Sequence, residues 1–588
     1  MSRNKITGEK KARKELNVAT LTLCMIVKNE EEHIARCLQS VKGAVDDIVI
    51  VDTGSTDRTV EICKSFGARV YHHPWQDSFS IARNQALKYV KTEWALQLDA
   101  DEELDPADIP LLRRALHEKR FNSICVTIFN NLPEGIVSKF YYRRVYRTKM
   151  AHYEGRVHNQ IVVPGAVGMR DIRIYHHGYN LPPEKMAAKY ERTEILLLRQ
   201  IEEEPANIFY RFNLVRIYRN KQEYDGAIST GLAALQMPNV RSRVGYYLMI
   251  VNDICHSMLL AQRAHEVFPL CAEALKTDPL NMDLLFAMAG AYVSIGAYKN
   301  AILYYQKWLK AKQKTDGKPI DLAMSVDTYS LDAVVLENIG KCYKYIGQYD
   351  PAIENLEKAI AANPGRLSPY KALALCYIEQ HDLAKATHVL ERSVSKNIAD
   401  SFVFYKLGVL LRELGHFDQA QKYMQRSLQL DEDAPDVWNA NGQLLLVRGK
   451  TVEALQNFNR CLQINPNHLG AKLNRSHALL LLSKNQEAQK ELIAILSSEP
   501  QDYGIFSEAG ELCCTHHLFV PAISFYEKYL QQNPDDVKAL HNLASCYAQT
   551  GNFDSARIGY SAVLNINPSY QPTIQSLEYL QKISALVE

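Results

Sequence analysis

The stretches that decide the fold are residues 21–30, 48–57 and 94–103, which read LTLCMIVKNE, IVIVDTGSTD and WALQLDADEE. Each begins with an apolar run typical of a buried strand and ends in acidic or amide side chains. Gly54 permits a tight turn after the second run, and Thr56 or Asp57 can cap the helix that follows. Three such strands predict a ligand site where their carboxyl ends meet.

Further β-rich runs alternate with helical patterns across residues 19–180. The predicted strands are Thr20–Val27, Asp47–Val51, Arg69–Tyr71, Trp94–Leu98 and Ser123–Phe129, and the helical patterns cover 30–42, 58–66 and 79–90. This alternation predicts an α/β unit with a largely parallel sheet and helices on its faces.

Two aspartates follow the strand that begins at Trp94. Because Asp99 and Asp101 are two residues apart, they point to the same side of an extended backbone. Hard carboxylate oxygens arranged in this way suit Mg²⁺ or Mn²⁺ and leave positions open for phosphate. A D-x-D at an exposed turn is common, so its place directly after a buried-looking strand is what gives it weight.

Four blocks in order over residues 21–104 resemble family 2 glycosyltransferases of the GT-A fold. They begin at Leu21, Ile48, Ser78 and Trp94 and read LTLCMIVKNEEEHIARCLQSV, IVIVDTGSTDRTVEI, SFSIARNQAL and WALQLDADEEL. The resemblance implies inverting transfer of a sugar from a nucleotide-diphosphate donor, with a UDP-sugar favoured, and a divalent metal, Mn²⁺ or Mg²⁺.

The same resemblance implies roles for particular residues. Asp52 would hold the nucleotide base, and Arg83 would face the diphosphate. Asp99 and Asp101 would form the metal motif, with Asp99 also near the nucleotide. The remaining nucleotide-binding candidates are Lys28, Asn29, Glu30 and Asp57.

A less regular second half supplies the candidates for acid–base chemistry. Glu154, Gly155 and His158 match an EGxxHE-like block of repeat-bearing relatives, but Asn159 stands where an acidic residue is usual. Glu154 is the first choice for the base that takes the acceptor's proton, with Glu102 and His158 in reserve. His176 belongs to a second matching block, together with Gly178 and Tyr179. It is expected to complete the metal shell, to contact the diphosphate or to be structural.

From about residue 330 onward, the sequence repeats with a period of 34. Alanine recurs from Ala352 to Ala556 at every step of 34, and Gly347, Gly415, Gly449 and Gly551 fall in a second phase. Small residues let two helices approach closely, and glycine suits the turn between them. The pattern resembles the tetratricopeptide repeat in seven units, and three looser units precede them, which predicts about ten repeats.

The predicted architecture is an α/β GT-A (Rossmann-like) catalytic domain followed by an all-α tetratricopeptide-repeat superhelix. The expected parts are a basic flexible N-terminal arm at 1–18, the transferase domain at 19–200, the repeats at 201–570 and a capping helix at 571–588.

Composition narrows the class of protein. The chain has 588 residues, 47% of them hydrophobic, and a formal net charge of +2, which argues against bulk nucleic-acid binding. No apolar run reaches the ~20 residues of a membrane helix. Twelve scattered cysteines without a disulfide framework favour the cytoplasm.

The acceptor is expected to be a protein or peptide bound along the repeat groove. An alternative acceptor is a cell-envelope glycan or a lipid-linked molecule. Alternative functions of the whole protein are a non-catalytic repeat scaffold and a nucleotidyl transferase. A homodimer through the repeats stays open.

Overall fold

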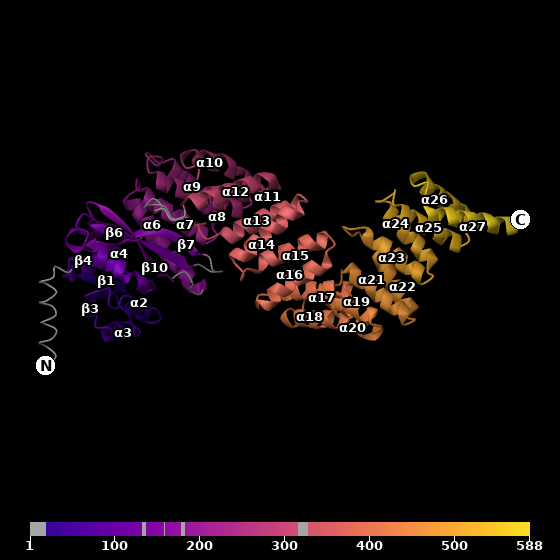
Figure 1. Cartoon of the computed structure of the whole chain (residues 1–588), viewed down its shortest axis with the longest axis horizontal. Helices are drawn as coiled ribbons and strands as arrows, with labels where there is room; N and C mark the ends of the chain where they lie inside the picture. The colour runs from indigo at the N-terminus through magenta and orange to yellow at the C-terminus, as the bar shows by residue number, and fades with distance from the viewer. Residues whose placement is uncertain (1–18, 132–136, 158, 178–182, 316–326, 588) are drawn as a thin grey trace. The chain divides into compact units, whose positions relative to one another are not determined.

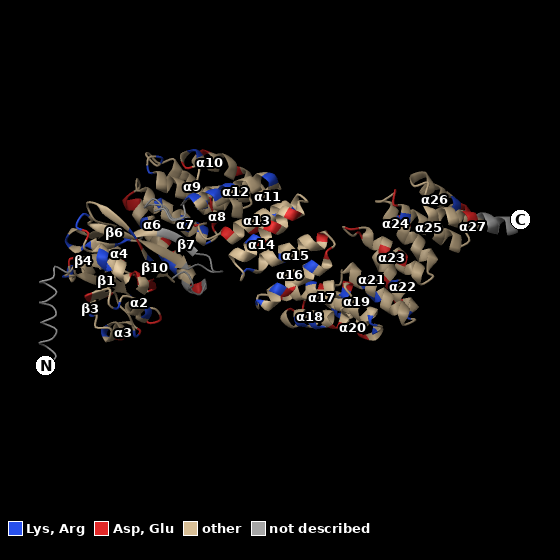
Figure 2. Ribbon diagram, in the orientation of Figure 1, with Lys and Arg blue, Asp and Glu red and all other residues tan. Residues whose placement is uncertain are grey.

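The computed structural model describes residues 19–131, 137–157, 159–177, 183–315 and 327–587. The chain divides into two compact units, Met1–Asn363 and Pro364–Glu588 (Figure 1). The first unit contains the sheet and the earliest helical repeats, and the second contains repeats alone. Basic and acidic residues are interspersed along both units (Figure 2), as the small net charge leads one to expect.

The first unit is built around an eight-stranded sheet in the order β3-β2-β1-β4-β7-β6-β10-β5. The strands are β1 Leu21–Val27, β2 Asp47–Asp52, β3 Arg69–His72, β4 Trp94–Gln97, β5 Glu102–Leu104, β6 Ser123–Asn131, β7 Val137–Arg147 and β10 Val167–His176. A separate antiparallel hairpin is formed by β8 His152–Glu154 and β9 Gln160–Val162.

The sheet is parallel only in part. β3, β2, β1 and β4 are parallel, as the sequence predicts. β7 runs antiparallel to both β4 and β6, and β5 runs antiparallel to β10, whereas β10 and β6 are parallel. The expectation of a largely parallel sheet therefore holds for the first half of the domain, and the whole sheet is mixed.

Alternation along β1 assigns its side chains to two cores. Leu21, Leu23 and Met25 are buried with helices α2 Ile34–Ser40, α3 Thr59–Ser65 and α5 Ile109–Ala115. Cys24 faces the opposite side, where α4 Phe79–Lys88 and the β8–β9 hairpin cover the sheet. This two-sided burial explains why β1 is apolar at every position except Thr22.

Helices continue the first unit after the sheet. They are α6 Pro183–Glu203, α7 Ile208–Asn220, α8 Tyr224–Leu235, α9 Val244–Leu260, α10 Ala264–Thr277, α11 Met282–Ser294, α12 Tyr298–Thr315, α13 Asp332–Tyr345 and α14 Tyr349–Ala362.

The second unit continues the same pattern. Its helices are α15 Leu367–Glu379, α16 Leu383–Ser395, α17 Ser401–Glu413, α18 Phe417–Leu430, α19 Pro435–Val447, α20 Thr451–Ile464, α21 Leu469–Leu481, α22 Asn485–Leu496, α23 Gly504–Thr515, α24 Phe519–Leu530, α25 Val537–Gln549, α26 Phe553–Ile566 and α27 Gln571–Val587. Within the described residues, α7–α26 pair into ten hairpins, so the predicted repeat fold is confirmed.

The repeat phases have direct structural causes. A Cβ added to Gly442 would lie 2.4 Å from the Phe458 ring, so only glycine allows α19 and α20 to pack this closely. The turn between paired helices needs a positive φ, which Gly415 (φ 80°) adopts easily. His381, Ser483 and His517 occupy the same phase and also have positive φ, at 57–61°.

Candidate active site

The loops after β1 and β2 are joined by hydrogen bonds at the carboxyl edge of the sheet. Asn29 has φ 55°, and its side-chain oxygen accepts a bond of 2.8 Å from the backbone N–H of Thr56. The Ser55 hydroxyl in turn accepts from the backbone N–H of Asn29 at 3.0 Å. These bonds fix both loops, so Asn29 is structurally important whichever ligand they surround.

Asp52, at the end of β2, is a buried acceptor. Its Oδ1 accepts from the Ser55 backbone N–H at 3.0 Å, and its Oδ2 lies 3.0 Å from Nδ1 of His72. Burial opposes ionisation, but these hydrogen bonds lower the pKa of Asp52 below its ordinary value. An ionised carboxylate in this position can accept hydrogen bonds from a heterocyclic base.

Glu30 lies in an acidic environment. Burial and the charges of Asp101 and Asp99 raise the pKa of Glu30 to about 7. Its backbone N–H is bound by Thr59 Oγ1 at 2.7 Å, and Asp57 in turn accepts a 2.6 Å bond from the same hydroxyl. Glu30 and the two strand-end aspartates therefore belong to one electrostatic group.

Asp99 is held between two buried arginines. Arg83 donates from Nη2 to Oδ1 at 2.6 Å, and Arg144 places Nη2 3.6 Å from Oδ2. Burial favours the neutral acid, but the two guanidinium groups hold the pKa of Asp99 well below its usual range. Glu102 binds Arg144 and accepts from the Asp99 backbone N–H at 2.9 Å, which fixes the turn.

Arg83 does not use all of its N–H groups in hydrogen bonds to the described residues. It is 8% exposed, yet its Nε and Nη1 atoms are buried without a hydrogen-bond partner among the described residues. The ring of Tyr153 lies 5.6 Å from its guanidinium carbon and supports it from one side. A buried cation with unused N–H groups is suited to receive an anion.

Asp101 and His176 meet at the same edge of the sheet. His176 Nε2 lies 3.3 Å from Asp101 Oδ2, and its Nδ1 lies 2.8 Å from Asn130 Oδ1. Register explains this arrangement, since His176 on β10 pairs with Asn130 on β6 and with Glu102 on β5. Burial opposes the charged ring, but the bond with Asp101 raises the pKa of His176.

A divalent ion fits the chemistry of these donors. Asp101 offers a carboxylate and His176 an imidazole, and Asn130 orients the second ring nitrogen, a common arrangement around metal-binding histidines. Among the described residues, no three His, Cys, Asp or Glu side chains are already placed as a ligand set. Any ion would therefore take ligands from a nucleotide diphosphate as well, as Mg²⁺ commonly does.

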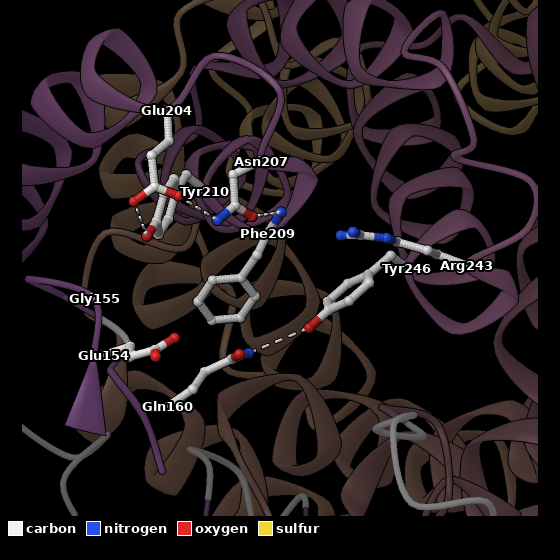
Figure 3. A pocket seen from close by; sticks show the side chains of 9 residues that line it. All are labelled: Glu154, Gly155, Gln160, Glu204, Asn207, Phe209, Tyr210, Arg243 and Tyr246. Carbon is white, nitrogen blue, oxygen red and sulfur yellow. Dashed lines mark hydrogen bonds between the residues drawn. The ribbon is translucent and has the colours of Figure 1, made fainter. Parts of the chain in front are cut away.

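Glu154 lies on a separate element, the β8–β9 hairpin. The Asn84 side chain binds both the N–H and the C=O of Tyr153, at 2.8 and 2.9 Å, and so ties β8 to α4. Tyr153 points towards Arg83, so Glu154, the next residue of the strand, faces the other way. It points into a cavity of 430 Å³ (Figure 3).

The structure therefore sorts the predicted site residues into groups. Asp99, Asp101, Glu102, Arg83, His176 and Glu30 form one charged cluster, and Asn29, Asp52 and Asp57 lie in the adjoining loops. Lys28 is exposed beside them. Glu154 lines the cavity. His158, Gly178 and Tyr179 lie outside the described residues.

Three residues next to this cluster could not be predicted from the sequence. Arg144 sits in a strand rich in arginine, and only the sheet order places it against Asp99. Asn130 becomes a partner of His176 through strand register. The charge of Lys189 on α6 offsets part of the rise in the pKa of Glu30 and helps to lower the pKa of Asp101, and no motif marks this lysine.

Comparison with known families agrees with this fold. Residues 22–173 match the family described as glycosyl transferase family 2, and residues 347–397, 405–468 and 519–578 match tetratricopeptide repeat families. The N-terminal domain is thus similar to glycosyl transferase family 2, and the helical hairpins that follow are similar to tetratricopeptide repeats.

Similar proteins include members of both classes. A TPR repeat-containing protein of Synechococcus elongatus is 52% identical over 15% of this chain and 22% of its own length. The SPbeta prophage-derived glycosyltransferase SunS of Bacillus subtilis is 28% identical over 32% of this chain and 46% of its own. An uncharacterized glycosyltransferase of Rickettsia typhi is 44% identical over 14% of this chain and 27% of its own length. The chain covers less than half the length of each of these relatives.

Proposed function

We propose that the protein is a metal-dependent, inverting glycosyltransferase that moves a sugar from a nucleotide-diphosphate donor to a protein or peptide side chain. A UDP-sugar is the first candidate for this donor. The observation that carries the proposal is the buried Arg83, which spends one nitrogen on Asp99 and leaves two others for an anion at the strand ends. The family of residues 22–173 and the glycosyltransferase names of the relatives support it.

In this proposal the donor lies across the carboxyl ends of β1, β2 and β4. Asp52 accepts hydrogen bonds from the base, and the Asn29 and Asp57 loops, with Lys28 beside them, surround the nucleoside. Arg83 and Arg144 hold Asp99 in place, and the free N–H groups of Arg83 bind the diphosphate. Asp101 and His176 hold the ion, which when bound offsets negative charge on the departing nucleotide.

The acceptor attacks the anomeric carbon from the face opposite the diphosphate, so a sugar ring separates the base from the charged cluster. Glu154 is the proposed base, because it is exposed and lines a cavity that can admit an acceptor. Glu102 is buried against Arg144, which supports a positioning role for it instead. His158 stays an alternative base.

The first repeats support a polypeptide acceptor, because α7 and α9 form part of the cavity that Glu154 enters. Twelve free thiols support a reducing compartment as the site of action. Among the described residues, no helix combines the length and apolar character needed to cross a bilayer.

A panel of nucleotide sugars tests the proposal. The full chain is incubated with each donor and Mn²⁺, Mg²⁺ or excess chelator, and the nucleotide product is identified. Slow metal-dependent release of nucleoside diphosphate from one donor is expected, and Asp101→Ala should abolish it. Pyrophosphate release would indicate nucleotidyl transfer, and no turnover with any donor and added protein would favour a repeat scaffold.

A further inference from the structure

The cavity beside Glu154 joins the transferase domain to the first repeats. One wall comes from the β8–β9 hairpin, with Glu154 and Gln160, and the other from the starts of α7 and α9. Gln160 Nε2 donates to the Tyr246 hydroxyl at 3.3 Å across the gap (Figure 3). Both walls belong to the same compact unit, so the cavity is a property of that unit.

Two carboxylates in this cavity have no lysine or arginine partner among the described residues. Glu204 accepts from Asn207 Nδ2 at 3.0 Å and from the Tyr210 hydroxyl at 3.5 Å, and both donors are neutral. Glu154 contacts only the ring of His152, at 2.9 Å, within the described chain. Two carboxylates and one arginine, Arg243, line the cavity, so its lining has an excess of negative charge, which attracts a cation.

Aromatic rings lie between the carboxylates. Phe209 packs edge-on to Tyr246 with centroids 6.0 Å apart, and Tyr210 lies 5.9 Å from Phe209. In Figure 3 the Phe209 ring is directed into the space between Glu154 and Tyr246. Ring faces and carboxylates together bind ammonium and guanidinium groups that have lost much of their water.

We propose that this cavity binds a lysine or arginine side chain of the polypeptide acceptor, close to the residue that receives the sugar. The proposal rests on the proposed function and adds the class of side chain that the acceptor must present. Arg243 lines the other end of the cavity, where it suits a backbone carbonyl or a carboxylate of the same acceptor.

A neutral glycan is the competing occupant, because aromatic rings and amides also bind sugars. A glycan would leave Glu154 and Glu204 without a cationic partner, so the charge of the cavity favours a basic side chain.

Binding of short peptides to the full chain tests this site without a donor. The probes are acetylated, amidated Gly-Ser-X-Ser-Gly peptides with X lysine, norleucine or glutamate, and an N-acetylglucosamine disaccharide, measured by ligand-detected NMR. The lysine peptide is expected to bind about tenfold more tightly than the norleucine peptide, the size of one charge-assisted contact with a ring face.

Variants locate the preference. Glu204→Gln and Tyr246→Ala should abolish it, Glu204→Lys should transfer it to the glutamate peptide, and the neighbouring exposed Glu202→Gln should leave it unchanged. Donor hydrolysis, measured in parallel, reports folding and should persist in all four variants.

Equal binding of the three peptides, tighter binding of the disaccharide, or a lysine preference that survives Glu204→Gln would overturn the proposal. A wild-type chain that prefers the lysine peptide through Glu204 but hydrolyses no donor would instead overturn the proposed function.

Discussion

The two buried arginines beside Asp99 are already paired with carboxylates before any ligand binds. Arg83 and Arg144 face Asp99 and Glu102, so two cations meet two anions in a largely buried cluster. This pairing keeps the arginines folded inward, and the unused donors of Arg83 still give an incoming anion a site. In the proposed function, the diphosphate of the sugar donor would therefore bind to arginines that are already held in position.

Arg83→Lys should lower donor hydrolysis by about 10²–10³-fold, because an ammonium cannot bind Asp99 and offer a planar pair of donors at once. Nucleoside diphosphate release and nucleotide affinity are both measured. The control is Arg58→Lys on an exposed side chain that pairs only with Glu61 among described residues. An unchanged rate in Arg83→Lys would refute the assigned role.

Asp101→Asn should require at least about tenfold more Mn²⁺ for half-maximal hydrolysis, because an amide is a weaker ligand than a carboxylate. Asp99→Ala should also lower the rate strongly. Metal titration curves give the result, and Glu103→Gln, whose carboxylate faces His177, is the control. Identical curves for Asp101→Asn and wild type would exclude Asp101 as a ligand.

At the scale of elements, each repeat turn repeats one backbone conformation. Residues at positions 347, 381, 415, 449, 483, 517 and 551 all have positive φ, whether or not they are glycine. The array therefore tolerates local strain at three turns to keep one geometry. Packing of the small residues in the helices outweighs that strain.

Ser483→Gly and His381→Gly should each stabilise the chain by about 1 kcal/mol, because both side chains are exposed and glycine removes the strain of a positive φ. Urea unfolding measures the gain. Gly415→Ala is the reverse control and should destabilise the chain by a similar amount. A loss of stability in Ser483→Gly would contradict the strain argument.

Buried Asp283 on α11 should make stability depend on pH. It accepts bonds from the backbone N–H of Asp327 (3.2 Å) and Thr328 (2.8 Å), and burial together with the Asp327 charge raises its pKa to about 7. The folded state thus prefers the neutral acid, so this contribution to stability is complete below pH ~4 and is lost as the pH rises through 7.

Asp283→Asn keeps an acceptor but cannot ionise, so wild type should lose stability relative to this variant between pH 5 and pH 8. Urea unfolding at both pH values gives the comparison. Parallel pH profiles for the two proteins would show that Asp283 has an ordinary pKa in the folded state.

Local patterns in the sequence predicted most of the elements. The first four strands and the ten helical hairpins follow from apolar runs and from the period of 34. Local sequence patterns did not predict the direction of β7 or the contact of Arg144 with Asp99, because strand order is set by packing between distant segments. The cavity escaped for the same reason, since Glu154 and Tyr246 are far apart in sequence.

At the scale of the molecule, the first repeats belong to the same compact unit as the sheet. Val157 of the hairpin region shares a core with Leu197 of α6 and Leu214 of α7, and Gln160 binds Tyr246. The predicted boundary at residue 200 thus lies inside a packed core, whereas the compact unit extends to Asn363. The surface that lines the Glu154 cavity therefore includes residues of α7 and α9.

A chain ending at Asn363 should therefore fold and hydrolyse donor like the full chain, but should glycosylate a protein acceptor more slowly because the later repeats are missing. A chain ending at Glu203 should lose hydrolysis as well, because Leu197 and Val157 become exposed. Circular dichroism checks folding in both. Protein glycosylation at the full rate by the chain that ends at Asn363 would show that Pro364–Glu588 has another role.

The regular step of the repeats has a consequence for how such chains change length. Removing residues 435–468, one pair of helices, joins Ala434 to Leu469 and leaves every turn and every small residue in phase. Each hairpin in such an array packs mainly on its neighbours. Insertions and deletions that survive natural selection should therefore come in multiples of 34 residues, so that the array lengthens or shortens by whole helical hairpins.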